Sequence, residues 1–153
     1  MYKNEDVKFN KDDIIDHNSV GAIVTNEFGE ILVEDHIKYN FFTLPIGKAH
    51  LNEDLGKILK KELFEECNIE VLSLKEIARI TKEDIREGHK VRMGIILFEI
   101  TDWTGNIYNK EPHKHRSVMF MSVEKIREIT NNGRNTSWMT ELFLEHYSKI
   151  KIR

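Results

Sequence analysis

Short apolar runs separated by turn residues dominate the first third of the chain. Residues 20–24 and 31–33 are apolar and flank the turn-forming residues 26–29, so this pattern predicts a hairpin. Residues 41–44 are a further strand candidate, which the next residue, a proline, should end because it cannot donate to a β-ladder. We expect a loop to follow and to run through Gly47.

Helical spacing replaces these runs from residue 52 onward. Asn52 is suited to cap the helix, and Glu53 and Asp54 are well placed for the positive end of its dipole. We expect the helix to end near Cys67, because Asn68 suits the left-handed conformation that often follows a helix.

The second half of the chain continues to mix strands and helices. Strand candidates are residues 77–81, 91–100 and 117–122, and a polar connection containing Gly88 should join the first two. A short helix is expected over residues 123–129. A C-terminal helix is indicated by apolar residues at helical spacing, namely Trp138, Met139, Leu142 and Phe143. This order favours an α/β or α+β sandwich.

Composition and charge fit one ordinary globular domain. Apolar residues make up 40% of the 153 positions and charged residues 32%, so we expect one domain over residues 1–153, with residues 1–16 as a charged lead-in. A cytoplasmic location is expected, because the lead-in lacks a secretory apolar region and a single cysteine cannot form an internal disulfide. The formal charge of -3 and the lack of a long apolar run argue against DNA and membrane partners.

Three glutamates share one face of the expected helix. Glu62, Glu65 and Glu66 are related by i, i+3 and i+4. The apolar residues seven positions before them are Leu55, Ile58 and Leu59. The carboxylates therefore continue the apolar stripe, and carboxylates this crowded and partly desolvated repel one another unless a cation such as Mg²⁺ neutralises them. A solvated acidic patch paired with nearby lysines explains the same spacing equally well.

The segment from Gly47 to Ile69 resembles the Nudix box. That motif is a glycine, five residues, a glutamate, seven residues and then R-E-U-x-E-E-x-G-U, where U is a bulky aliphatic residue. Gly47, Glu53 and residues 61–69 match it in register, with two departures: Lys61 stands in place of the arginine and Asn68 in place of the second glycine.

The resemblance implies the Nudix fold, a mixed β-sheet sandwiched between α-helices, with the box over residues 47–69. It also implies a metal-dependent hydrolase that cleaves a phosphoanhydride bond in a nucleoside diphosphate linked to another moiety. Mg²⁺ or Mn²⁺ would be held by Glu62, Glu65 and Glu66, and Glu62 or Glu65 would help to deprotonate the attacking water. The expected partner is a small nucleotide substrate, and a homodimer is common in the family.

The resemblance adds four further expectations about the site. The backbone at Gly47 and the Glu111 carboxylate are additional candidate metal ligands, although a solvated loop position is the commoner role for a residue such as Glu111. Glu53 would orient the catalytic helix by pairing with the box arginine, here Lys61. A lysine lacks the planar two-point grip of arginine, so we expect looser orientation and reduced activity.

One alternative function and a few further residues remain beside this interpretation. The departure at Lys61 suits a Nudix-fold sensor or interaction module that binds nucleotide with weak or no hydrolysis, although the retained glutamates favour an enzyme. His113 and His115 would lie on one side of an extended segment, as a metal pair requires, but we expect both to be solvated loop residues. Tyr39 could stack on a base, but packing at a rim is the commoner role.

Overall fold

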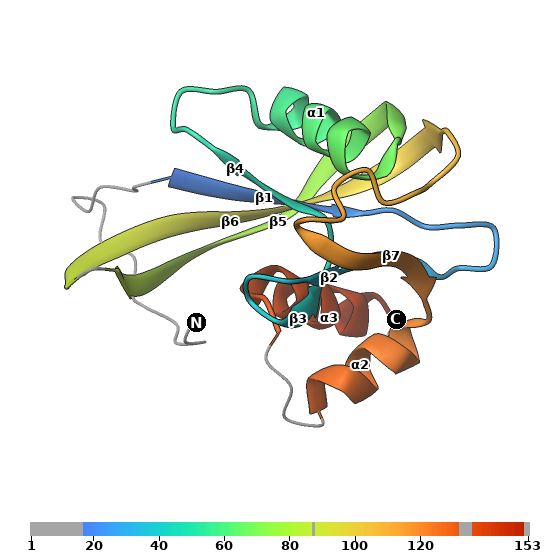
Figure 1. Cartoon of the computed structure of the whole chain (residues 1–153). Coiled ribbons are helices and arrows are strands. Elements are labelled where there is room, and N and C mark those ends of the chain that lie inside the picture. The colour runs from blue at the N-terminus through green and yellow to red at the C-terminus, as the bar shows by residue number, and fades with distance from the viewer. Residues whose placement is uncertain (1–16, 87, 132–135, 152–153) are drawn as a thin grey trace.

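The computed structural model describes residues 17–86, 88–131 and 136–151, and this part of the chain contains seven strands and three helices (Figure 1). In chain order these are β1 (His17–Ile23), β2 (Ile31–His36), β3 (Phe41–Thr43), β4 (Ile46–Ala49), α1 (Leu55–Cys67), β5 (Glu70–Arg86), β6 (His89–Thr104), β7 (His115–Met121), α2 (Val123–Asn131) and α3 (Trp138–Lys151). The expected lead-in over residues 1–16 lies outside the described residues. Within the described ranges, no helix is long and apolar enough to cross a membrane.

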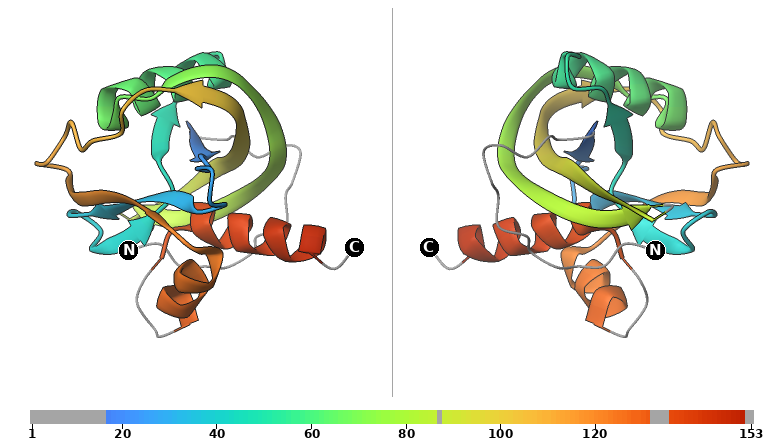
Figure 2. Two further views of the ribbon diagram at one scale, coloured as in Figure 1. Left: turned by 90° about the vertical axis from the view of Figure 1, so that its right-hand side faces the viewer. Right: turned by 90° about the vertical axis from the view of Figure 1, so that its left-hand side faces the viewer.

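The strands form two sheets with helices on both sides. The first sheet has the order β4-β1-β6-β5 and is mixed, because β1 is parallel to β6 and antiparallel to β4. The second sheet has the order β3-β2-β7 and is antiparallel. Helix α1 lies on one side of this arrangement and helices α2 and α3 on the other, while the β5–β6 hairpin curves around it (Figures 1 and 2). The expected fold class, a mixed sheet between helices, is confirmed.

Alternate residues along the strands face two separate cores. In β6, residues on one face join the core beneath α2 and α3, namely Met93, Ile95 and Leu97, and residues on the other join the core beneath α1, namely Ile96, Phe98 and Ile100. Strand β2 follows the same rule, since Leu32 lies in the α1 core and Val33 in the other. Glu34 has the parity of Leu32, and its side chain therefore points toward α1.

Helix α1 is capped by different residues at its two ends. Its N-cap is Asp54, whose side chain accepts a hydrogen bond from the Lys57 backbone, so the expectation of an Asn52 cap was wrong by two residues. Both residues are good caps, and the helix simply begins later. The expected C-terminal end is confirmed: Asn68 has φ 63°, and the Asn68 N–H donates to the Phe64 carbonyl.

Two predicted connections differ from the structure. Residues 46–49 form β4, which pairs with β1, so the predicted loop through Gly47 was wrong. Pro45 does not prevent this, because its carbonyl still accepts a hydrogen bond from the Ala22 N–H. The predicted hairpin is present only next to its turn, where Thr25 bridges Ile31 and the Leu32 N–H donates to the Val24 carbonyl, since β1 and β2 then diverge into different sheets.

Candidate functional site

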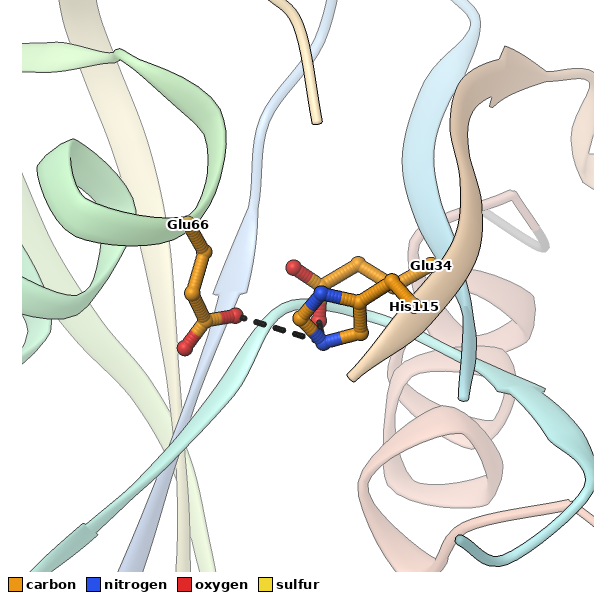
Figure 3. A group of neighbouring side chains, drawn as sticks. All are labelled: Glu34, Glu66 and His115. Carbon is orange, nitrogen blue, oxygen red and sulfur yellow. Dashed lines mark ion pairs between the residues drawn. The ribbon is translucent and has the colours of Figure 1, made fainter. Parts of the chain in front are cut away.

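Three buried side chains from three elements meet beside α1. Glu34 on β2, Glu66 on α1 and His115 at the start of β7 place one ligand atom each within 4.8 Å of one another. His115 Nε2 lies 3.4 Å from Glu34 Oε1 and 3.8 Å from Glu66 Oε1. Figure 3 shows the Glu66 carboxylate extending from the helix toward the other two side chains. We call this group the buried cluster.

Strand parity and helix register bring the cluster together. Glu34 is directed toward α1 by the alternation of β2, and Glu66 lies on the same line of the helix as Leu59, which is fully buried. His115 pairs in register with His36 of β2, next to a β-bulge. The cluster therefore lies where α1, which packs on the first sheet, meets the second sheet.

The loop before β7 is tied to the end of α1. The Lys110 N–H donates to the Glu66 carbonyl, and the Lys110 side chain donates to the Phe64 carbonyl. At its other end the loop is closed by the His115 N–H, which donates to the Glu111 carbonyl. Glu111 thus lies beside the cluster, and its Oε1 is buried without a hydrogen-bond partner among the described residues.

Burial changes the protonation of all three cluster members. It raises the pKa of Glu34 to about 7, and burial together with the nearby Glu34 charge holds the pKa of Glu66 far above its ordinary value. Burial lowers the pKa of His115 to about 4, so the imidazole is neutral near pH 7. Near pH 7 and without a cation, Glu66 therefore retains its proton and Glu34 is partly protonated.

A Glu34→Gln variant tests the raised carboxyl pKa through stability. Such a group favours the folded state below its unfolded pKa of 4.5, and this contribution is lost as the pH rises through about 7. With chelator present, Glu34→Gln should therefore gain stability relative to the wild type as the pH goes from 5 to 8. The shift from 4.5 to about 7, at about 1.4 kcal/mol per unit, sets the gain at up to about 3 kcal/mol.

Urea denaturation at the two pH values measures this gain. The exposed Glu70→Gln variant serves as the control, and its stability relative to the wild type should not change between them. A Glu34→Gln effect of equal size at pH 5 and pH 8 would contradict the assignment.

The box glutamates have three different environments. Glu66 is buried with 4% of its surface exposed, Glu62 is half-buried and Glu65 is exposed. Glu62 lies close enough to Glu66 to raise the pKa of that residue further. Its side chain packs over Gly47, where a Cβ atom would lie 2.5 Å from Glu62 Cγ. The structure thus brings Glu62 and Glu66 together and leaves Glu65 on the surface, 3.9 Å from Lys61.

The expected pair between Glu53 and Lys61 is absent from the described residues. Glu53 Oε1 instead accepts a hydrogen bond of 2.7 Å from the His50 N–H. Lys61 Nζ lies near Glu65, one helical turn onward. A single ammonium group on a flexible stem takes the nearest carboxylate, whereas an arginine fork is shaped for a two-point contact.

Sequence reasoning missed one member of the cluster, Glu34, and set another, His115, aside as a solvated loop residue. One feature of the sequence could have identified Glu34. It follows directly after the apolar residues 31–33, and the alternation of the strand places its side chain on the same face as the apolar Leu32. The expectation for His115 was wrong, because this residue is buried with 2% exposed, whereas His113 is exposed as expected. The alternation of His113 and His115 was a local signal, but it could not show that His115 is buried, because β7 begins two residues before the predicted strand and the position of His115 depends on pairing with β2.

A cavity of about 360 Å³ opens beside the box residues. Its apolar lining includes Met93, Ile95, Trp138 and Met139, and its polar and aromatic lining includes His17, His36, Lys38, Tyr39 and Lys48. No carboxylate is among the described residues that line it. Gly47 lies between the two features, because it lines the cavity and also packs against Glu62.

Comparisons with known proteins place this geometry in a family. The chain resembles a MutT Nudix hydrolase from Burkholderia pseudomallei with a TM-score of 0.67 and 16% identity, over 85% of this chain and 96% of that one. It also resembles the E. coli ORF135 protein (TM-score 0.65, 19% identity, 88% and 90% covered) and a C. elegans Ap4A hydrolase (TM-score 0.57, 19% identity, 89% and 98% covered). These identities establish the fold alone.

The sequence comparison is more specific than the structural likeness. No curated protein matches the chain. A family model described as the NUDIX domain matches residues 16–142, from the start of β1 into α3. Because that match spans most of the sequence, the protein belongs to the Nudix hydrolase family.

Proposed function

We propose that the protein is a divalent-metal-dependent hydrolase that cleaves a phosphoanhydride bond in a nucleoside diphosphate linked to another moiety. The observation that carries the proposal is the position of the box carboxylates. Glu66 has a buried oxygen without a hydrogen-bond partner, Glu62 lies beside it over Gly47, and Gly47 forms part of the wall of a cation-lined cavity.

The donor set fits a hard divalent cation. Glu62 and Glu66 would hold Mg²⁺ or Mn²⁺, and Glu111 supplies a further buried oxygen nearby. Glu65 would join them by leaving its surface ion pair with Lys61. An exposed ion pair of this kind contributes less than about 1 kcal/mol, so it is easily broken. An ion bound there would withdraw charge from the phosphate oxygens and increase the acidity of the attacking water.

The exposed box carboxylate is the stronger candidate for the base. Glu65 is open to solvent, so it can accept a proton from the attacking water and release it afterwards. Glu62 is half-buried and packed against Gly47, which suits a ligand. Glu53, held by the His50 backbone, would fix the loop before α1 rather than the helix itself.

The cavity lining offers contacts for both a nucleoside and its phosphates. The apolar lining that includes Trp138 and Met93 suits a base, which accepts aromatic and apolar contacts on its faces. Lys38 and Lys48 are exposed at the cavity and attract phosphate oxygens. The scissile bond would then lie near Gly47, within reach of the box carboxylates.

A charge reversal at Lys48 tests this orientation. Lys48→Glu should raise KM for the nucleotide by about 10-fold, since a cationic phosphate contact becomes repulsive, with a smaller change in kcat. Lys125→Glu on α2 makes the same change in net charge away from the cavity lining and should leave KM near that of the wild type. Equal KM values for both variants would exclude Lys48 from phosphate binding.

The proposal is tested by a turnover screen of the purified protein. The panel contains nucleoside triphosphates, nucleotide sugars, ADP-ribose, dinucleoside polyphosphates and capped RNA, each with Mg²⁺, Mn²⁺ or chelator. We expect metal-dependent release of phosphate or mononucleotide from at least one class. Nucleotide binding without cleavage across the panel would instead support the sensor alternative, which the absence of a Glu53–Lys61 pair favours.

A further inference from the structure

We propose that Glu34, Glu66 and His115 form a second metal site, which binds a divalent transition ion such as Zn²⁺ or Co²⁺ in preference to Mg²⁺. This site shares Glu66 with the proposed catalytic site but does not require that the chain be a hydrolase. Two of its three members, Glu34 and His115, lie outside the Nudix box.

The spacing of the three ligand atoms suits a small ion. The distances from His115 Nε2 to Glu34 Oε1 and Glu66 Oε1 are 3.4 and 3.8 Å. In a tetrahedral site with metal–ligand distances of about 2.0–2.1 Å, neighbouring ligand atoms lie about 3.4 Å apart. The Glu34 and Glu66 oxygens also lie within 4.8 Å of one another, so small side-chain movements would let one ion contact all three atoms.

Two buried oxygens in the cluster have no hydrogen-bond partner among the described residues. They are Glu34 Oε1 and Glu66 Oε1, on side chains that are 0% and 4% exposed. Both are the atoms that face His115 Nε2, and Figure 3 shows the three side chains directed toward one another. A buried acceptor without a partner destabilises the fold, and one cation would satisfy both oxygens at once.

The nitrogen ligand decides which ions fit. Mg²⁺ prefers an octahedral set of oxygens and keeps several waters, for which a buried site has little room. One imidazole with two carboxylates is a donor set that suits Zn²⁺ and related ions. Two carboxylates would also balance the charge of one divalent ion.

A neighbouring thiol orients one of the ligands. Cys67 Sγ donates a hydrogen bond of 3.4 Å to Glu34 Oε2, which leaves Oε1 free for the ion. Outer contacts of this kind hold metal ligands in position. The sulfur is not among the three ligand atoms that converge, so Cys67 acts as an outer donor rather than as a ligand.

The position of the site gives it a structural consequence. Glu66 belongs to α1, which packs on the first sheet, whereas Glu34 and His115 belong to the second sheet. A bound ion would therefore join the helix to β2 and β7. Ion binding to the folded state alone raises the unfolding temperature, so metal affinity and thermal stability should change together.

The test is cobalt binding by the metal-free full-length protein. We expect a visible spectrum of tetrahedral Co²⁺ without sulfur-to-cobalt charge transfer, competition by Zn²⁺, and no competition by millimolar Mg²⁺. Glu34→Gln and His115→Asn should weaken cobalt binding by at least about 100-fold, beyond the effect of losing an outer contact. His113→Asn, two residues away and exposed, should bind like the wild type.

Several outcomes would overturn the proposal. They are unchanged cobalt affinity in a folded Glu34→Gln variant, a sulfur ligand in the zinc X-ray absorption spectrum of the wild type, or cobalt binding that only Glu62 and Glu65 variants abolish. The X-ray spectrum uses the unaltered chain, so it decides even where a variant fails to fold. Turnover with Mg²⁺ is measured separately. Cobalt binding without turnover would contradict only the proposed hydrolase activity, and turnover without cobalt binding would contradict only the proposed second metal site.

Discussion

Replacing Glu66 by glutamine should reduce metal-dependent turnover by at least about 100-fold while making the metal-free protein more stable. Turnover falls because the amide cannot supply the negative oxygen that the ion needs, and the charge stabilisation provided by a catalytic metal is worth several kcal/mol. Stability rises because burial and the Glu34 charge disfavour ionised Glu66 in the fold.

The two effects are measured separately. Steady-state kinetics with Mg²⁺ and Mn²⁺ reports turnover, and thermal unfolding in chelator reports stability. Glu65→Gln should also slow turnover, but it should leave stability nearly unchanged because Glu65 is exposed. A Glu66→Gln enzyme that is as fast as the wild type would show that Glu66 is not a ligand of the catalytic metal. A less stable variant would mean that the buried carboxyl is satisfied by the protein alone.

Adding a single methyl group at Gly47 should lower turnover by about 10- to 100-fold. The new Cβ would lie 2.5 Å from Glu62 Cγ, so the half-buried Glu62 side chain must move away from the cavity wall. A displacement of about 1 Å near a reacting centre is enough for an effect of this size. The comparison is Gly47→Ala against the wild type, with kcat and the Mn²⁺ dependence of turnover as the readouts.

Gly56→Ala is the matched control. Its Cβ would meet its nearest neighbours at 3.5 and 3.6 Å, which is ordinary contact, and Gly56 lies in the first turn of α1, where alanine is tolerated at least as well as glycine. This variant should be at least as stable as the wild type and fully active. Equal activities of the two alanine variants would show that Glu62 does not need its present position.

The fold class could be predicted because the local patterns were strong. Residues 91–100 lie wholly within β6, and Asn68 takes the left-handed conformation that its side chain tolerates. The strands β5 and β6 are longer than predicted, because the residues beyond the predicted ranges mix polar and apolar positions and are held by pairing with each other. Local composition therefore indicates where an element lies better than where it stops.

The candidate site was only partly predictable for a different reason. The helix period placed Glu66 in line with the buried Leu59, and this residue is indeed buried. The same reasoning could not reveal Glu34 and His115 as neighbours of that carboxylate. Their position depends on the pairing of β2 with β7, which are far apart in sequence and belong to a different sheet from the strands that α1 covers.

The long-range pairing of β1 also has a consequence for synthesis on the ribosome. Val20 pairs with Ile96 in the parallel ladder, so the central partner of β1 is translated much later than β1 itself. At ordinary translation rates this interval is roughly 4–15 s, far longer than the time a chain needs to collapse. Throughout this interval β1 can pair only with β4, so the first sheet cannot be completed until β6 has been synthesised.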